Sequence, residues 1–323
     1  MSQEVVSVVI PCYNCDEYIE ETIESVRAQT YTGVELVMVD DGSTDGTRRI
    51  IEQHSDDAVC HFGPNRGASF ARTTGTRLAT GDYIQYLDAD DRLHPEALER
   101  RIEALRKPGA DVAYSRYRRL IPKGSKFREG KVVNKTIERV HPDPEIATLG
   151  SFWLPPVALT YRRRIVDKIG GWNKTLPVIQ DARFLQDAAY HGATFVKVSG
   201  VLAEYRDHEE GSLSTSDNRA FNRDIWVNAR QIEERWRRDQ GRLTSSQKVA
   251  LASVYDHCAR SFFGVDRVRY IQAVRRLNHL GEEETSEELK RYTVAEDWFG
   301  YKIASWGAGL LNKARTLSGS LFV

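Results

Sequence analysis

The chain has 323 residues, a length that predicts about two domains and allows a large buried core. Its 46 basic and 46 acidic residues balance, which argues against a nucleic-acid-binding protein, because such proteins usually carry a basic surface. The sequence contains no run of 18 apolar residues and no charged-then-apolar leader. A cytoplasmic protein is therefore expected, free or at the inner face of the membrane.

Predicted strands and helices alternate along the first part of the chain. The apolar run at residues 5–10 predicts a strand covered on both faces, and the acidic residues after position 16 predict the first turn of a helix. The pattern repeats with strands at 34–39, 58–62 and 83–87 and with helices at 47–53 and 67–79. Because the connections are short, we expect an α/β fold in which a mostly parallel sheet has helices on both faces.

Polar side chains follow the first two of these strands, at the ends where parallel sheets bind ligands. Tyr13 and Asn14 follow the first strand, and Asp40 and Asp41 follow the second. An aromatic ring and a carboxylate are what a nucleotide site requires, although no glycine-rich phosphate loop is present. Each signal alone is also explained by a turn or by packing; their coincidence at one sheet edge favours a site.

The strand at 83–87 runs directly into three carboxylates, Asp88, Asp90 and Asp91. If the extended geometry persists, Asp88 and Asp90 point to the same side. Two adjacent carboxylates then favour a hard cation, Mg²⁺ or Mn²⁺, whose open positions a diphosphate would fill. The alternative is a solvated acidic turn that caps the helix beginning near residue 95.

Four separated motifs occur in order: Pro11-x-Tyr13-Asn14, Asp40-Asp41-Gly42-Ser43-x-Asp45, Asn65-x-Gly67-x₄-Arg72 and Asp88-x-Asp90-Asp91. Over about residues 4–215 the chain thereby resembles the inverting family 2 glycosyltransferases of GT-A fold. The resemblance implies a metal-dependent, hexosyltransferase-type enzyme of polysaccharide or glycoconjugate synthesis. Its donor would be a nucleotide-sugar, most often a UDP-sugar, and its acceptor a saccharide or a lipid-linked molecule.

The resemblance also implies roles for individual residues. The positions that it places at the donor are Pro11, Tyr13, Asn14, Asp41, Gly67, Arg72, Asp88 and Ala89. Tyr13 is expected to lie against the base and Asp41 to contact it. Arg72 would line the nucleotide pocket, and its alternative is a surface arginine on a helix.

The implied metal ligands are Asp90 with Asp88, and a histidine from the family's closing loop. That loop resembles Tyr205-Arg206-x-His208, followed by Ser212 and Ser214. A histidine ligand suits Mn²⁺ better than Mg²⁺, which prefers oxygen. A lone surface histidine is the alternative.

Between these motifs, strands are predicted at 111–117, 158–161 and 201–206, and a helix at 163–169. Residues 121–150 lose periodicity and carry many charges, which predicts a variable insertion over the acceptor side. In the segment 152–156 that follows, one of the two aromatic residues, Phe152 or Trp153, could stack on a sugar, and core packing is the commoner use of such residues.

Asp181 opens a predicted amphipathic helix. In the family that the chain resembles, an aspartate at this position is the catalytic base that removes the acceptor hydroxyl proton. The family usually places Glu or Gly before it, whereas this chain has Gln180, which leaves open whether that position binds the acceptor. The alternative is that Asp181 only caps the helix.

From residue 217 the resemblance stops, so we expect a catalytic domain at 1–216 and a helical region at 217–323. Helices are predicted at 218–238, 245–262 and 268–280. Near the end, Phe299, Ile303, Trp306 and Leu310 recur at helical spacing. This apolar stripe is expected to dock on the catalytic domain or on a twin subunit; interfacial contact with a membrane is the alternative.

Cys12 and Cys15 have C-x-x-C spacing without the further ligands of a zinc site, so they are either ordinary thiols or a redox dithiol. Two other functions compete with glycosyl transfer. A nucleotidyltransferase would also bind a nucleotide at the strand ends, but it needs a glycine-rich loop after the first strand. An inactive homologue is disfavoured because Asp88, Asp90 and Asp181 are all present.

Overall fold

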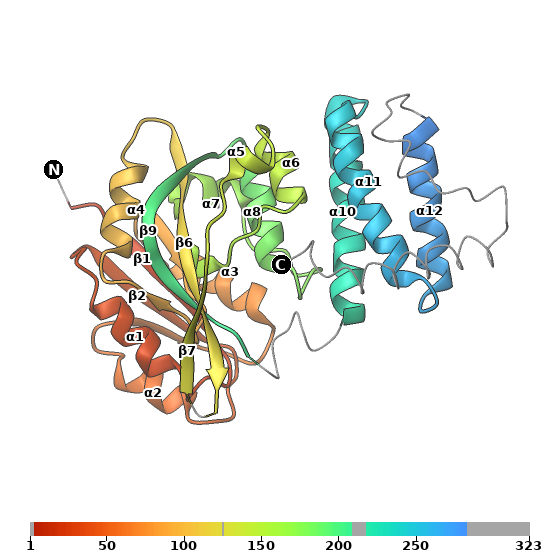
Figure 1. Ribbon diagram of the computed structural model, residues 1–323. Coiled ribbons are helices and arrows are strands. Elements are labelled where there is room, and N and C mark those ends of the chain that lie inside the picture. The colour runs from red at the N-terminus through yellow and green to blue at the C-terminus, as the bar shows by residue number, and fades with distance from the viewer. Residues whose placement is uncertain (1–2, 125, 209–217, 283–323) are drawn as a thin grey trace. The chain divides into compact units, whose positions relative to one another are not determined.

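The computed structural model describes residues 3–124, 126–208 and 218–282. The chain divides into two compact units, Met1–Asp217 and Asn218–Val323 (Figure 1). The first unit carries the sheet and the second is helical throughout its described part.

Within the described residues, the first unit is built on a nine-stranded sheet of order β3-β2-β1-β4-β8-β6-β9-β5, with β7 paired to β6. As expected, β1, β2, β3 and β4 are parallel, and the pair β6 and β9 is parallel too. The sheet is mixed beyond β4, because β8 runs antiparallel to both β4 and β6. The strands are β1 (Val6–Cys12), β2 (Val34–Asp40), β3 (Val59–Phe62), β4 (Tyr83–Tyr86), β5 (Arg92–Leu93), β6 (Ala110–Lys123), β7 (Lys126–Val133), β8 (Leu159–Arg162) and β9 (Thr194–Arg206).

Helices alternate with the parallel strands and bury one apolar side each; α1, for example, buries Ile19, Ile23 and Val26. The helices of this unit are α1 (Ile19–Arg27), α2 (Thr47–Gln53), α3 (Ala68–Leu78), α4 (Ala97–Leu105), α5 (Ile137–Val140), α6 (Pro144–Leu149), α7 (Arg163–Ile169) and α8 (Gln180–Tyr190), with the 3-10 turn η1 at Pro156–Ala158.

The strand β1 is the centre of the core, since Val6, Val8, Val9 and Ile10 are all fully buried. Helix α3 lies so close to it that a Cβ on Gly75 would come within 2.4 Å of the Val9 side chain. Only glycine fits at that point, so the position of α3 over β1 is fixed to a fraction of an ångström.

The segment 121–150, predicted to be a variable insertion, contains regular structure despite its lack of periodicity. Strand β6 continues to Lys123 and forms a hairpin with β7, and the short helices α5 and α6 follow (Figure 1). The residues of β7 are exposed or half-buried throughout and carry many charges. Because such a strand buries neither face fully, its sequence lacks the apolar alternation on which the prediction depended.

The C-x-x-C cysteines are free and buried. The pKa of the Cys12 thiol is raised well above its ordinary value by a hydrogen bond with Cys15 and by burial. A thiol with a raised pKa is a poor nucleophile, so the ordinary-thiol interpretation is favoured over a redox dithiol.

The second unit contains the three helices that the sequence predicts, α10 (Asn218–Gln240), α11 (Ser245–Phe262) and α12 (Arg267–Glu282). Trp226, Trp236 and Tyr255 form the centre of their core, each at most 3% exposed. No helix in the described ranges is long and apolar enough to cross a membrane. The apolar stripe at Phe299, Ile303, Trp306 and Leu310, like Ser212 and Ser214, lies outside the described residues.

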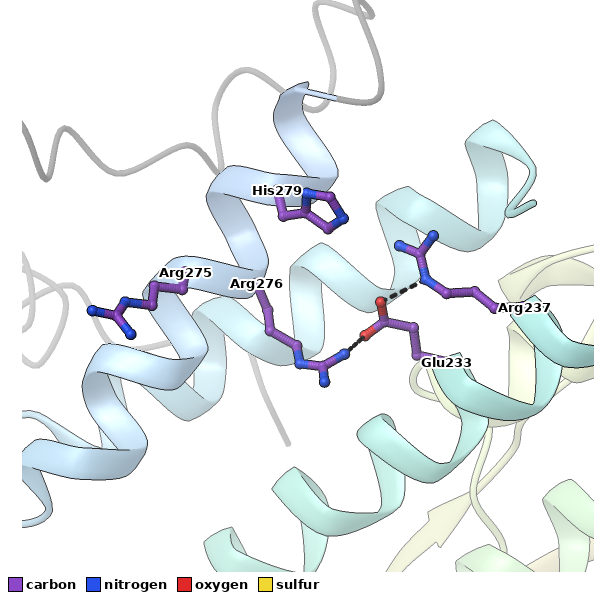
Figure 2. Close-up of a pocket in the computed structure, with 5 residues that line it drawn as sticks. All are labelled: Glu233, Arg237, Arg275, Arg276 and His279. Atoms are coloured by element: carbon purple, nitrogen blue, oxygen red, sulfur yellow. Dashed lines mark hydrogen bonds and ion pairs between the residues drawn. The ribbon is translucent and has the colours of Figure 1, made fainter. Parts of the chain in front are cut away.

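A buried carboxylate, Glu233, joins the three helices of this unit. Its side chain is 3% exposed and accepts hydrogen bonds from Arg237 Nε at 2.9 Å, Arg276 Nη1 at 2.6 Å and Tyr255 Oη at 2.5 Å. Figure 2 shows the two guanidinium groups on either side of it, in a cavity of about 370 Å³ that Arg275 and His279 also line. Burial alone would raise the pKa of Glu233, but the Tyr255 hydrogen bond and the Arg276 charge lower it overall.

Replacing Glu233 by alanine should therefore lower the free energy of unfolding of the full chain by about 3 kcal/mol, because it leaves two cations and a buried hydroxyl without their acceptor. Since the folded pKa is lowered, the contribution is complete above the ordinary glutamate pKa. It is lost as the pH falls through the folded value. Urea unfolding at pH 7 measures the effect. Glu234→Ala is the control, because Glu234 is 59% exposed and should matter by at most about 0.5 kcal/mol. Equal stability of the two variants would contradict the prediction.

Candidate active site

The parallel strands β1, β2 and β4 have their carboxyl ends at one edge of the sheet. Cys12, the last residue of β1, is aligned with Asp40, the last residue of β2, and β4 runs alongside β1 up to Tyr86. The loops that follow these strands therefore begin side by side. Of the predicted donor residues, Tyr13, Asn14, Asp41, Asp88 and Ala89 lie in them, whereas Pro11 is in β1, Gly67 is the N-cap of α3 and Arg72 is on α3.

The loop after β1 is joined to the loop after β2 through Asn14. Its Oδ1 accepts the Thr44 N–H at 2.8 Å, and its own N–H donates to Ser43 Oγ at 3.1 Å. Asn14 has a φ of 49°, which asparagine tolerates better than most residues. Next to it, Tyr13 is 49% exposed, so its ring is available for stacking, whereas Pro11 is half-buried within β1.

Asp41 holds the chain segment that leads into α3. Its two carboxylate oxygens accept the N–H groups of Arg66 at 2.9 Å and Gly67 at 2.7 Å, and the residue is 5% exposed. Gly67 is the N-cap of α3 and has a φ of 90°, which favours glycine. A carboxylate offers about four lone-pair sites, so Asp41 retains acceptor capacity for a nucleobase.

Arg72 is buried on α3, which excludes the alternative of a surface arginine. Its Nη2 donates to Asp88 Oδ1, and its guanidinium carbon lies 4.6 Å from the ring centroid of Trp172. The buried Nε and Nη1 of Arg72 have no partner among the described residues. Arg72 thus binds Asp88, the first carboxylate of the acidic motif, and its Nε and Nη1 groups remain as hydrogen-bond donors.

The acidic motif is a turn, so the expectation of an extended Asp88–Asp90 pair is wrong. β4 ends at Tyr86, and the Asp91 N–H bonds to the Asp88 carbonyl at 3.1 Å. The two carboxylates consequently have different partners: Asp88 binds Arg72, and Asp90 Oδ2 lies 2.7 Å from His208 Nε2. Nor does the turn cap the following helix, whose N-cap is Glu96.

Arg206, which the sequence analysis named in the closing loop without a role of its own, binds the acidic motif. Its Nη1 donates to the Asp90 carbonyl at 2.7 Å, and its backbone N–H donates to Asp91 Oδ1 at 2.9 Å. It also pairs with Glu21. Ala89, at the centre of the motif, is buried and its carbonyl accepts a hydrogen bond from Thr22 Oγ1 at 2.9 Å. The signal for Arg206 was its place two residues before His208.

Asp91 is fully buried, and its pKa is raised well above the ordinary value by burial and by the negative charges of Asp90 and Asp88. The pKa of Tyr205 is raised by burial and by the charges of Asp91, Asp88 and Asp181, in that order. These carboxylates therefore all lie near Tyr205, so the acidic motif and the predicted base belong to one site.

Asp181 is not the N-cap of α8, which is Ile179, but it lies in the first turn and accepts a hydrogen bond from the Ala182 N–H. Its Oδ2 also accepts a hydrogen bond from Trp153 Nε1 at 2.7 Å. Burial raises the pKa of Asp181; the Ala182 hydrogen bond, the Arg72 charge and the Trp153 hydrogen bond lower it, and the Asp88 charge raises it. Trp153 is half-buried, and its indole N–H binds the predicted base.

Gln180, the departure from the family pattern, points elsewhere. It is 5% exposed, its Oε1 accepts the Ser69 hydroxyl at 2.6 Å, and its Nε2 donates to the Pro177 carbonyl. The Gln180 side chain therefore links α8 to α3. The absence of the family's usual glutamate at this position does not take away a side chain that would bind Asp181.

The comparison with protein families decides the classification. A family model described as Glycosyl transferase family 2 matches residues 7–169, which is half of the chain. The chain belongs to this family. The match begins in β1 and ends with α7, so it includes the acidic motif but neither Asp181 nor His208.

Family 2 relatives of this chain act in polysaccharide and glycoconjugate synthesis. Chondroitin synthase of Escherichia coli is 42% identical over 106 residues, which is 32% of this chain and 16% of that protein. The enzyme UDP-Glc:alpha-D-GlcNAc-diphosphoundecaprenol beta-1,3-glucosyltransferase WfaP of Escherichia coli is 35% identical over 116 residues, covering 35% of this chain and 46% of that protein. In four such relatives the match covers between 16% and 52% of the relative's length.

Solved structures confirm the expected GT-A fold. TarS 1-349 of S. aureus in complex with UDP-GlcNAc has a TM-score of 0.64 at 18% identity, covering 90% of this chain and 84% of that chain. The mannosyltransferase PcManGT from Pyrobaculum calidifontis, in complex with GDP-Man and Mn2+, has a TM-score of 0.55 at 17% identity, covering 97% and 89%.

For a family 2 protein, the acidic motif raises the question of a metal. No group of three or more His, Cys, Asp or Glu side chains in the described part of the chain is gathered closely enough to hold an ion alone. Asp90 Oδ2 and His208 Nε2 nevertheless lie 2.7 Å apart and provide one oxygen and one nitrogen atom as metal ligands. Mg²⁺ and Mn²⁺ sites commonly take the remaining ligands from water and substrate phosphates, so the pair fits such an ion.

The double acceptor role of Asp41 gives a test. Asp41→Asn has only one acceptor oxygen, so one of the Arg66 and Gly67 amides should lose its bond and exchange with deuterium at least tenfold faster. Hydrogen exchange of the full chain measures this, with Asp45→Asn as a control in the neighbouring turn, where Asp45 binds Thr47 instead. Unchanged protection of both amides would contradict the assignment.

Proposed function

We propose that this chain is an inverting glycosyltransferase that moves a hexosyl group from a nucleotide-sugar, most often a UDP-sugar, to an acceptor hydroxyl. The observation that carries the proposal is the position of Asp181. Its Oδ2 accepts the Trp153 N–H at 2.7 Å, and the charges of Arg72 and Asp88 act on its pKa, so this carboxylate lies near the acidic motif. Because Asp88 is bound by Arg72 and Asp90 lies against His208, Asp181 is the carboxylate left to act as a base, and one base suits a one-step displacement with inversion.

The donor nucleotide is assigned to the loops after β1 and β2. The exposed Tyr13 ring would stack on the base, and Asp41 retains acceptor capacity towards it. Asn14 and Gly67 shape the two loops. The UDP-GlcNAc complex of TarS supports a uridine nucleotide, although the PcManGT complex holds GDP-Man.

Asp90 and His208 would hold a divalent cation, and the histidine favours Mn²⁺ over Mg²⁺. When bound, such an ion neutralises the leaving diphosphate as a Lewis acid, worth several kcal/mol. Asp88 is occupied by Arg72, so its role is to orient that guanidinium and to complete the donor pocket. Arg72 itself places positive charge beside the diphosphate.

Asp181 removes the proton from the acceptor hydroxyl as the acceptor oxygen attacks the anomeric carbon. The bond between that carbon and the phosphate oxygen breaks, and its electron pair leaves with the nucleoside diphosphate. The raised pKa of Asp181 brings this base closer to the working pH than a solvent-exposed aspartate. Holding both substrates in line contributes a further large part of the rate.

The acceptor is assigned as a saccharide or lipid-linked molecule, supported by the name of the WfaP relative. Nucleotidyl transfer finds no support, because no glycine-rich loop follows β1. An inactive homologue is disfavoured because Asp90, Asp88 and Asp181 all have defined partners in one site.

The first experiment is hydrolysis and transfer with a panel of nucleotide-sugars, with and without Mn²⁺. We expect one sugar nucleotide to be hydrolysed slowly in a metal-dependent reaction, and Asp90→Ala to lose most metal-dependent donor affinity in calorimetry with UDP and Mn²⁺. Asp82→Ala is the matched control, because Asp82 precedes the same strand and its side chain accepts the Val5 N–H at 3.0 Å. Full affinity in Asp90→Ala would overturn the metal assignment, and pyrophosphate release would favour nucleotidyl transfer.

The second experiment separates chemistry from binding. Asp181→Asn should keep the donor complex and the fold, while single-turnover transfer at saturating donor falls by about 10²–10⁴-fold. Asp187→Asn is the control on the same helix, because Asp187 pairs with Arg183 outside the donor motif and should keep its rate within about threefold. Near-normal transfer by Asp181→Asn would exclude the base assignment.

A further inference from the structure

Trp153 occupies a rigid loop between α6 and η1. Its neighbours Phe152 and Leu154 are each 1% exposed, whereas Trp153 is half-buried. The Phe152 ring meets the rings of Tyr114 and Phe195 edge-on at centroid distances of 5.3 and 6.4 Å. Because both neighbours are anchored in the core, the indole between them is directed to the site with little freedom.

The only polar atom of the Trp153 side chain, Nε1, is hydrogen-bonded to Asp181. Nε1 donates to Oδ2 at 2.7 Å, a bond between residues 28 positions apart in the sequence. Indole can donate but cannot accept, so it bonds to a lone pair and never competes for the proton that Asp181 is to take up. A carboxylate has about four lone-pair sites, which leaves room for the acceptor hydroxyl.

We propose that Trp153 is a positioning residue that orients the carboxylate of Asp181 towards the acceptor hydroxyl. This rests on the proposed role of Asp181 as the base. The ring also lies edge-on to Tyr205 at 6.4 Å, and the carboxylates of the acidic motif act on that same tyrosine. Trp153 therefore contacts both the base and Tyr205.

The hydrogen bond also has an electrostatic effect. Hydrogen bonds to the ionised form stabilise it, so the Trp153 N–H lowers the pKa of Asp181 against the rise that burial causes. The other charged or titratable groups that act on Asp181 are Arg72 from α3, Asp88 after β4, and Tyr161 and Tyr205 from β8 and β9. None of these is altered when Trp153 alone is changed.

Two substitutions separate the N–H from the ring. Trp153→Phe keeps an aromatic ring and loses the donor. Trp153→Gln loses the ring but places an amide nitrogen four bonds from Cα, as Nε1 is in tryptophan. The measurement is single-turnover transfer by the full chain as a function of pH, at saturating donor.

In Trp153→Phe the acidic limb of the profile should move up by about 1 pH unit, the usual effect of removing a hydrogen bond to a charged group. The plateau should fall about tenfold through lost orientation. Trp153→Gln should return the limb at least halfway to the wild-type position. Phe152→Leu, which disturbs loop packing only, should melt earlier but keep the wild-type limb.

An unmoved limb in Trp153→Phe overturns the inference, and so does a limb that moves equally in Phe152→Leu. The proposed function is judged separately by Asp181→Asn: loss of transfer there with an unmoved Trp153→Phe limb refutes the role of Trp153 alone. Normal transfer by Asp181→Asn refutes the base itself. If Trp153→Phe is too unstable to assay, the Trp153→Gln limb decides, because only a retained donor predicts a near-normal limb.

Discussion

The site depends on gathering several carboxylates at one edge of the sheet. Asp88, Asp90, Asp91 and Asp181 all act on Tyr205, and burial together with the charges of Asp90 and Asp88 raises the pKa of Asp91. Each carboxylate that remains available has its own partner. Arg72 binds the first, His208 the second, and Trp153 the last. Asp91 is fully buried and receives the Arg206 N–H.

These partners come from different elements. Arg72 lies on α3, His208 follows β9, and Trp153 precedes η1. Strand β9 runs parallel to β6 and therefore to β4, so His208 follows a strand that ends at the same edge as β4. Strand β8 runs antiparallel to β4, so the segment before it, which contains Trp153, reaches that edge as well.

The sequence predicted the parallel half of the fold because its strands are buried and its glycines and acidic residues mark the turns. It failed where the signal depends on tertiary contacts. The β7 hairpin has charged, half-exposed residues and so no apolar period. The Asp88–Asp90 geometry could not be deduced from strand alternation, because β4 ends two residues before Asp88. The Trp153–Asp181 bond spans two segments that share no local pattern.

The contacts of helix α3 restrict where the sequence of this fold can change in evolution. Its N-cap Gly67 is bound by Asp41, its Ser69 binds Gln180, and its Arg72 binds Asp88. Gly75 packs α3 closely against β1. A change in α3 that suits one of the proposed substrates would therefore disturb the residues proposed to act on the other. New donor or acceptor preferences should therefore evolve in the exposed loop around Tyr13 and in the β7 hairpin, while α3 stays constrained in sequence.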